Sequence, residues 1–255
     1  MKHHIAYLSS ARRLFSEKIP AFCKKKVLAL EKKSIAFYVR AMDHLEQQIF
    51  EIARKLFQES AGCHDFDHTL RVAANAEKLL AALPEADPSV VRLAALLHDC
   101  ARAEEDISGG KVDHAALGAV KAKKILLQAN ADPALADAVA SAIACHRYRG
   151  KLLPQTLEEK IVYDADKLDS LGAIGIGRAF HFAGKFGARV HNTQAEALAG
   201  KPYGKEDTAF WEYLVKLRHV PEKMLTEPGR ALAAQRLQFM TGFFAEMEKE
   251  CASEN

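Results

Sequence analysis

The chain has 255 residues, a net charge of +3 and 49% hydrophobic residues, which fits one globular domain with or without an appendage. No apolar run approaches the roughly 20 residues of a membrane-spanning helix, and the N-terminus lacks the apolar stretch of a secretory signal. The five cysteines are an odd number without a CxxC pair, which argues against a disulfide scaffold or a zinc ribbon. We therefore expect a cytoplasmic protein with reduced cysteines.

Positive charge is concentrated at the N-terminus. Residues 1–41 hold ten lysines or arginines and two acids, a net charge of +8, which leaves −5 for the rest. We interpret this segment as a solvated or poorly ordered extension outside the native core, in preference to an arm that contacts nucleic acid or anionic lipid. A third hypothesis makes Met42 the natural start, because residues 42–255 read as a complete domain and the first 41 add no motif.

Apolar residues recur at helical spacing through most of residues 42–255. Helices are predicted over 42–60 and 65–83, where apolar side chains fall on one face at steps of three and four. Pro88 suits the first turn of a third helix, which is predicted to run on through Glu105. This third helix is apolar on most sides, so we expect it to be central.

The second half of the chain continues the helical pattern. Helices are predicted over 113–128, 132–146, 207–219 and 229–250, with a helix pair over 158–183 and a long excursion over 184–205. No strand-type alternation stands out. The predicted fold class is all-α, an irregular helical bundle rather than a repetitive solenoid.

The residues most indicative of chemistry are His98 and Asp99, which end the apolar run from Leu93 to Leu97. A buried imidazole and carboxylate are costly unless something neutralises them, and a divalent cation does so. His68 and Asp166 are candidate partners on other helices. Two imidazoles and two carboxylates suit Mn²⁺, Mg²⁺, Fe²⁺, Co²⁺ or Ni²⁺ and leave positions open for water and substrate oxygen, whereas structural zinc sites more often use thiolates.

The order of these residues, in CHDFDHTLRV, LLHDC and YDADKLD, resembles the HD superfamily of metal-dependent phosphohydrolases. The resemblance covers about Met42 to Met247, and DHAALGAVKAKKIL, ACHRYRG and EEKIVYDADKLDSLGAIGIGRAF look like successive helices of the small bacterial HD hydrolases. It implies an HD-type helical bundle with a divalent metal ion, or two ions, and four metal ligands: His68, His98, Asp99 and Asp166.

Further residues follow from the resemblance and from their positions. His114 and His146 stand where related enzymes place histidines facing the metal pocket, for a second ion or the substrate phosphate; capping of helix ends is the alternative. Arg71 and Lys167 are expected to hold phosphate, and Asp169 to orient a ligand or act as a base. Arg147 and Arg149 are either phosphate ligands or solvated charges. The role of His64 stays open, and Asp65 is expected to cap the helix that carries His68.

The leading hypothesis is a phosphohydrolase of the phosphomonoesterase or phosphodiesterase type, which cleaves a phosphate ester or anhydride with a metal-activated water. Its substrate would be a nucleotide or another small phosphorylated metabolite. One alternative is an HD-fold di-iron oxygenase, with His114 and His146 as additional iron ligands. Another is a non-catalytic module that binds a nucleotide and regulates a partner.

Overall fold

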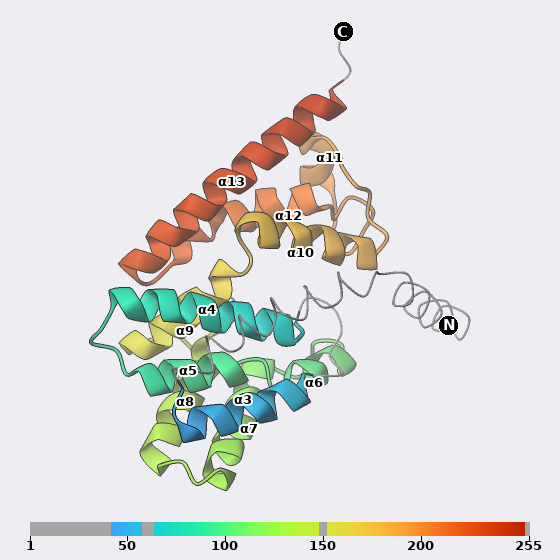
Figure 1. Ribbon diagram of the computed structural model, residues 1–255. Coiled ribbons are helices and arrows are strands. Elements are labelled where there is room, and N and C mark those ends of the chain that lie inside the picture. The colour runs from blue at the N-terminus through green and yellow to red at the C-terminus, as the bar shows by residue number, and fades with distance from the viewer. Residues whose placement is uncertain (1–41, 58–63, 148–151, 253–255) are drawn as a thin grey trace, which may run out of the picture. The chain divides into compact units, whose positions relative to one another are not determined.

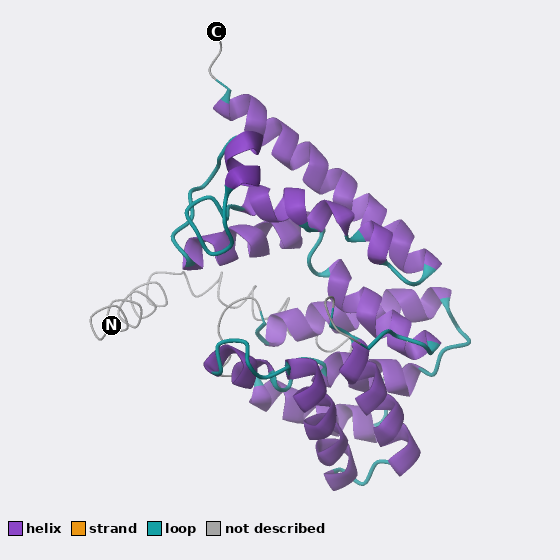
Figure 2. Ribbon diagram, turned by 180° about the vertical axis from the view of Figure 1, so that it is seen from behind, coloured by secondary structure: helices purple, strands orange, loops and turns teal. Residues whose placement is uncertain are grey.

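The computed structural model describes residues 42–57, 64–147 and 152–252. Every regular element in these ranges is a helix, as Figure 2 shows, which confirms the predicted all-α class. The helices lie within one compact unit, His44–Asn255. The predicted extension over residues 1–41 and Arg149 fall outside the described residues, and the proposed domain boundary stays a prediction.

The first group of helices is built around α5 (Pro88–Leu97). This helix contacts four others: α3 (His44–Leu56), α4 (Phe66–Ala82), α8 (Pro133–Cys145) and α9 (Leu157–Leu168) (Figure 1). All its side chains from Leu93 to Leu97 are buried, and burial stabilises each large apolar side chain by about 1.5–3 kcal/mol. The predicted central position of this segment is confirmed. α7 (His114–Gln128) completes the group by packing on α8.

Helices α5 and α8 both begin with the sequence Asp-Pro. Asp87 caps α5 by accepting hydrogen bonds from the backbone N–H groups of Ser89 and Val90, and Pro88 occupies the first turn. Asp132 and Pro133 repeat this arrangement at α8. Because proline fixes φ and its missing N–H would have no partner in the first turn, Asp-Pro sets both starting points locally.

The prediction of one helix from Pro88 through Glu105 is wrong. α5 ends at Leu97, a turn follows, and α6 (Arg102–Ile107) is a separate helix. The N–H of Cys100 donates to Leu97 O at 3.0 Å, and that of Arg102 to Asp99 O at 2.8 Å, which closes the turn. A continuous helix would point His98 and Asp99 about 100° apart, whereas in this turn His98 Nε2 lies 3.6 Å from Asp99 Oδ2.

The second group contains α10 (Gly172–Lys185), α11 (Gln194–Ala199), α12 (Ala209–Val215) and α13 (Glu227–Cys251), with the short helices η1 (Leu217–His219) and η2 (Pro221–Lys223). The predicted helix pair over 158–183 is broken just before Gly172, whose φ of +73° suits a residue without Cβ. The predicted excursion over 184–205 contains α11. Contacts of α13 with α9 and α4 join the two groups.

No helix in the described part of the chain has both the length and the apolar character needed to cross a membrane.

Candidate metal centre

The predicted site residues lie at or near helix ends. His98 and Asp99 follow the C-terminal end of α5, His146 follows that of α8, and Asp166 is in the last turn of α9. His114 begins α7 and His68 lies in the first turn of α4, where Asp65 accepts the N–H of His68, as predicted for a cap. Local capping and breaking signals therefore determine where these side chains enter the centre.

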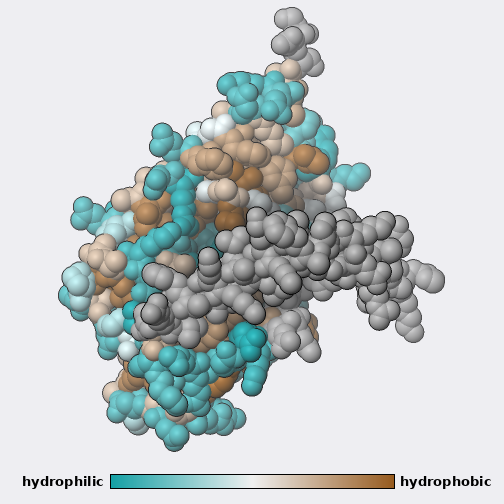
Figure 3. Space-filling view, viewed as in Figure 1, coloured by the Kyte–Doolittle hydropathy of each residue, from teal (hydrophilic) through white to brown (hydrophobic). Residues whose placement is uncertain are grey.

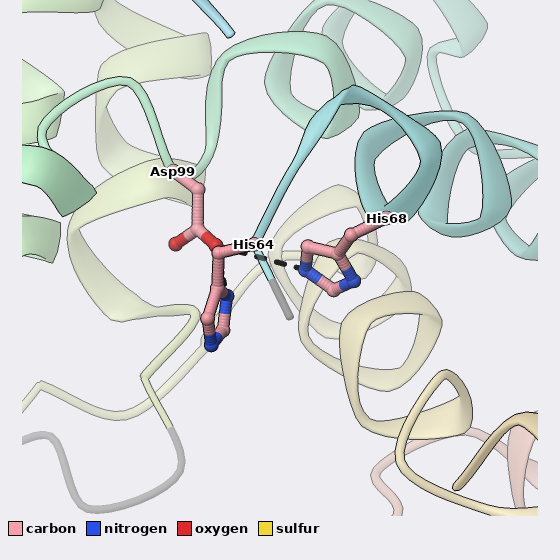
Figure 4. A group of neighbouring side chains, drawn as sticks. All are labelled: His64, His68 and Asp99. Atoms are coloured by element: carbon pink, nitrogen blue, oxygen red, sulfur yellow. Dashed lines mark hydrogen bonds and ion pairs between the residues drawn. The ribbon is translucent and has the colours of Figure 1, made fainter. Parts of the chain in front are cut away.

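A first cluster consists of His68, His98, Asp99 and Asp166. The Nε2 atoms of His68 and His98 are 3.2 Å apart. His68 Nε2 is 3.4 Å from Asp166 Oδ1 and 3.6 Å from Asp99 Oδ2. Figure 4 shows His68 and Asp99 facing one another, with His64 beside the carboxylate. The structure thus brings together four side chains that are spread over about a hundred residues of sequence.

Hydrogen bonds on the other ring nitrogens assign the tautomers of these histidines. His68 Nδ1 donates to Asp169 Oδ2 at 2.7 Å, and His98 Nδ1 donates to Ala95 O at 2.9 Å. In the neutral tautomers, the Nε2 lone pairs of both rings then face each other and two carboxylates. Such a convergence of lone pairs is repulsive unless a proton or a metal ion occupies its centre, and this set of nitrogen and oxygen donors fits a divalent metal ion.

A second cluster has the same construction. The Nε2 atoms of His114 and His146 are 3.3 Å apart and lie 3.5 Å and 3.7 Å from Asp99 Oδ1. Nδ1 of His114 lies 2.5 Å from Glu105 Oε2, and Nδ1 of His146 lies 2.6 Å from Ile143 O. Both oxygens are acceptors, so both Nε2 lone pairs face Asp99. These three side chains form a second group that fits a metal ion.

Asp99 is the side chain common to both clusters. Its Oδ2 atom faces the first cluster and its Oδ1 atom faces the second. A carboxylate in this position can bridge two ions. His64 Nδ1 donates to Asp99 Oδ2 at 2.7 Å and helps to hold this orientation.

The electrostatics of the centre favour added positive charge. Burial opposes the ionisation of Asp99, yet His98 and His64 hold the pKa of its carboxyl well below the usual range. Burial also opposes a proton on His68, but hydrogen bonds to Asp166 and Asp169 outweigh it and raise the pKa of His68 to about 9. Burial lowers the pKa of His98 to about 4. The centre therefore keeps its carboxylates ionised and gathers a compensating positive charge.

Two acidic residues hydrogen-bond the Nδ1 atoms of histidines in the clusters. Asp169 accepts from His68 Nδ1 and also from Arg71 and Arg178. Glu105, which the sequence analysis did not single out, lies against His114 Nδ1. Nothing in the run Arg-Ala-Glu-Glu-Asp distinguishes buried Glu105 from half-buried Glu104, since the difference arises from the fold.

The basic residues predicted to hold phosphate lie in different surroundings. Arg71 Nε donates to Asp169 Oδ1 at 2.7 Å, so its guanidinium is bound to a carboxylate that supports His68. Lys167 Nζ donates to Asp166 Oδ2 at 2.6 Å and to His146 O at 2.8 Å, beside both clusters. Contact of either residue with phosphate stays a prediction.

A cleft of about 480 Å³ opens onto the two clusters. Its lining includes residues of both clusters and four cationic side chains: Arg102, Arg147, Lys167 and Arg178. Lys167 lines the cleft directly, whereas Arg71 is not among the described residues that do. Cationic groups at the mouth of a carboxylate-rich centre suit an anionic ligand that also contacts the metal.

Comparison with known proteins places these observations in a family. Residues 65–171 match the family described as "HD domain". Over 199 residues the chain is 35% identical to the uncharacterized protein YpgQ of Bacillus subtilis (strain 168), which covers 76% of this chain and 87% of the relative. This chain belongs to the HD-domain family. All six residues of the two clusters, four histidines and two aspartates, lie within the matched residues 65–171.

Solved structures of HD proteins agree with the fold. A predicted HD superfamily hydrolase from an uncultured Thermotogales bacterium matches with a TM-score of 0.61 and 29% identity over 86% of this chain and 99% of that one. Bacillus subtilis YpgQ in complex with ADP matches with a TM-score of 0.62 and 28% identity over 81% and 94%. These relatives support a metal-dependent hydrolase in general terms, and the HD family is one that binds divalent metals.

Proposed function

We propose that this HD protein is a phosphohydrolase that cleaves a phosphate ester or anhydride of a nucleotide or another small phosphorylated metabolite. The observation that carries the proposal is Asp99, whose two oxygens face two separate pairs of imidazole Nε2 atoms. The two clusters would each hold a metal ion beside a cationic cleft, and such a pair of ions would suit phosphoryl transfer to water.

Divalent ions bound there would lower the pKa of a coordinated water and neutralise charge on phosphoryl oxygens. The protein's part is to fix the geometry. Asp169 and Glu105 keep His68 and His114 in the tautomers that direct Nε2 inward. Lys167, tied to Asp166 and to the backbone of His146, presents a fixed ammonium group to the phosphate.

A group in the cleft must also take the proton from the attacking water. His64 lines the cleft and uses Nδ1 for its hydrogen bond to Asp99. Its Nε2 is therefore the ring nitrogen that can accept a proton, and we assign His64 this role. Asp169 is already bound to His68, Arg71 and Arg178, so we assign it the orientation of His68 rather than base catalysis.

A nucleotide is the substrate class that the comparisons support best, because the relative YpgQ was solved in complex with ADP. The cationic residues Arg102, Arg147 and Arg178 line the same cleft as the two metal clusters. They provide planar, multi-donor groups for phosphate oxygens.

The test is phosphate release by the purified full chain from a panel of nucleotides and sugar phosphates, with Mn²⁺ or Mg²⁺ added. We expect turnover that depends on the metal and that Asp99→Ala abolishes together with metal uptake. Asp137→Ala is the matched control, because Asp137 is an exposed carboxylate on α8. Oxygen uptake without phosphate release would favour the di-iron oxygenase. Undiminished turnover in Asp99→Ala would overturn the site assignment.

A further inference from the structure

Aromatic side chains also line the cleft that opens onto the metal clusters. Phe182, Tyr203 and Trp211 line it. The ring centroids of Phe182 and Tyr203 are 6.4 Å apart. The centroid of Phe186 lies 4.9 Å from that of Phe182 and 5.1 Å from that of Tyr203. Figure 3 shows hydrophobic side chains on the surface of the C-terminal helices, and Tyr203 is 67% exposed. An aromatic ring left open to solvent beside a cationic cleft offers a face for another planar group.

Tyr203 is held there by an unusual backbone. Its φ is +63°, in the left-handed region that a bulky residue rarely adopts. The N–H of Tyr203 donates to Asp207 Oδ2 at 2.6 Å, and Asp207 is buried. Strain of this kind persists only where the surroundings enforce it, and it is concentrated at ligand sites. The carboxylate of Asp207 therefore fixes the backbone from which the Tyr203 ring extends.

Helix α10 carries both an aromatic residue of the cleft and a residue that contacts the first cluster. Gly175, Ala179 and Phe182 lie on one face of α10 and line the cleft. Arg178, on the same helix, donates to Asp169 Oδ2 behind the first cluster. Arg178 and Phe182 are four residues apart, about 6 Å along the helix axis. The remaining part of a ligand whose phosphate lies at the clusters could therefore extend along this face of α10 to reach Phe182.

We infer that Phe182 and Tyr203 form a stacking subsite for a planar ring of the substrate, such as a nucleobase, and that Asp207 positions Tyr203 for it. This inference rests on the proposed function, since it assigns the ring end of the same phosphorylated substrate. The subsite is selective for flat aromatic rings but not for one base, because every base presents a π face.

The test separates ring recognition from phosphate recognition. The probes are α,β-methylene-ADP and methylenediphosphonate, which share a P–C–P bridge that resists hydrolysis and differ in the nucleoside. Their binding to the full chain with Mn²⁺ is measured by isothermal titration calorimetry. Tyr203→Ala is expected to weaken binding of the nucleotide analogue by about 5- to 100-fold and to leave the affinity for methylenediphosphonate unchanged. Tyr203→Phe should bind both probes as the wild type does.

Asp207→Ala should reproduce the selective loss, and the double variant with Tyr203→Ala should show no additional loss, as a positioning role requires. Phe239→Ala is the control, because Phe239 is an exposed ring on α13 outside the cleft lining. If Tyr203→Ala weakens both probes equally, or neither, the subsite is refuted. Absence of phosphate release in the hydrolysis assay, with the selective binding loss intact, would refute the proposed function alone.

Discussion

Glu105 Oε2 lies 2.5 Å from Nδ1 of His114 and thereby directs Nε2 of that ring toward Asp99. Asp169 has the same relationship to His68 in the first cluster, at 2.7 Å. Each cluster thus contains one histidine oriented by a carboxylate and one oriented by a backbone carbonyl. The two clusters are built on one plan, although most of their residues come from different helices.

Glu105→Gln is expected to weaken binding of the second ion about 10- to 100-fold, because a carboxylate that supports a ligating histidine fixes its tautomer and increases its basicity. A Mn²⁺ titration should still show one tight site, at the first cluster. Glu104→Gln is the matched control, since the neighbouring Glu104 pairs with Lys121 at the surface. Two tight sites in Glu105→Gln would contradict the assignment.

Arg71→Ala is expected to weaken binding of an ion at the first cluster about tenfold and to leave KM for the substrate unchanged at saturating metal. The reason is that Arg71 is bound to Asp169, through which it acts on His68. Metal titration and steady-state kinetics provide the two measurements, and Arg54→Ala on α3 is an exposed control. An increase in KM at unchanged metal affinity would instead place Arg71 on the phosphate, as the sequence analysis predicted.

Removal of metal is expected to lower the thermal stability of the protein. An ion that binds only the folded state adds about 2.7 kcal/mol per site when its free concentration is 100 times the dissociation constant. Melting curves in EDTA and in Mn²⁺ measure this difference, and Asp99→Ala should melt at the same temperature in both. If the wild-type protein melts at the same temperature in EDTA and in Mn²⁺, the result would argue against a bound metal ion.

Gly229→Ala is expected to destabilise the fold by about 1–3 kcal/mol, because a Cβ at this position would overlap the carboxylate of Asp164. That carboxylate accepts hydrogen bonds from the N–H groups of Leu225 and Thr226 at the start of α13. Gly242→Ala, in the middle of the same helix with open space around it, should stabilise by up to about 1 kcal/mol. Urea denaturation measures both, and equal effects would contradict this account.

The features predicted from sequence were those with a local cause. Helical spacing predicted the all-α class, Asp65 was predicted as a cap, and the apolar run before His98 indicated the central helix. The turn after Leu97 was missed because no glycine or proline marks it. Glu105, Arg178 and Asp207 were missed because their burial and partners arise only when distant helices pack. Motif order could bring His68 and Asp166 to attention, but only the fold gives their 3.4 Å separation.

His68 and Asp166 stand almost a hundred residues apart along the chain and meet within the first cluster. A cation bound by both side chains would act as a reversible cross-link. It would close a loop of about 100 residues, much as a disulfide does. Because such an ion would bind the folded chain, its loss would remove this cross-link without any change in covalent structure. The supply of metal would then affect how long each copy of the protein resists proteolysis, because proteases cleave the opened chain.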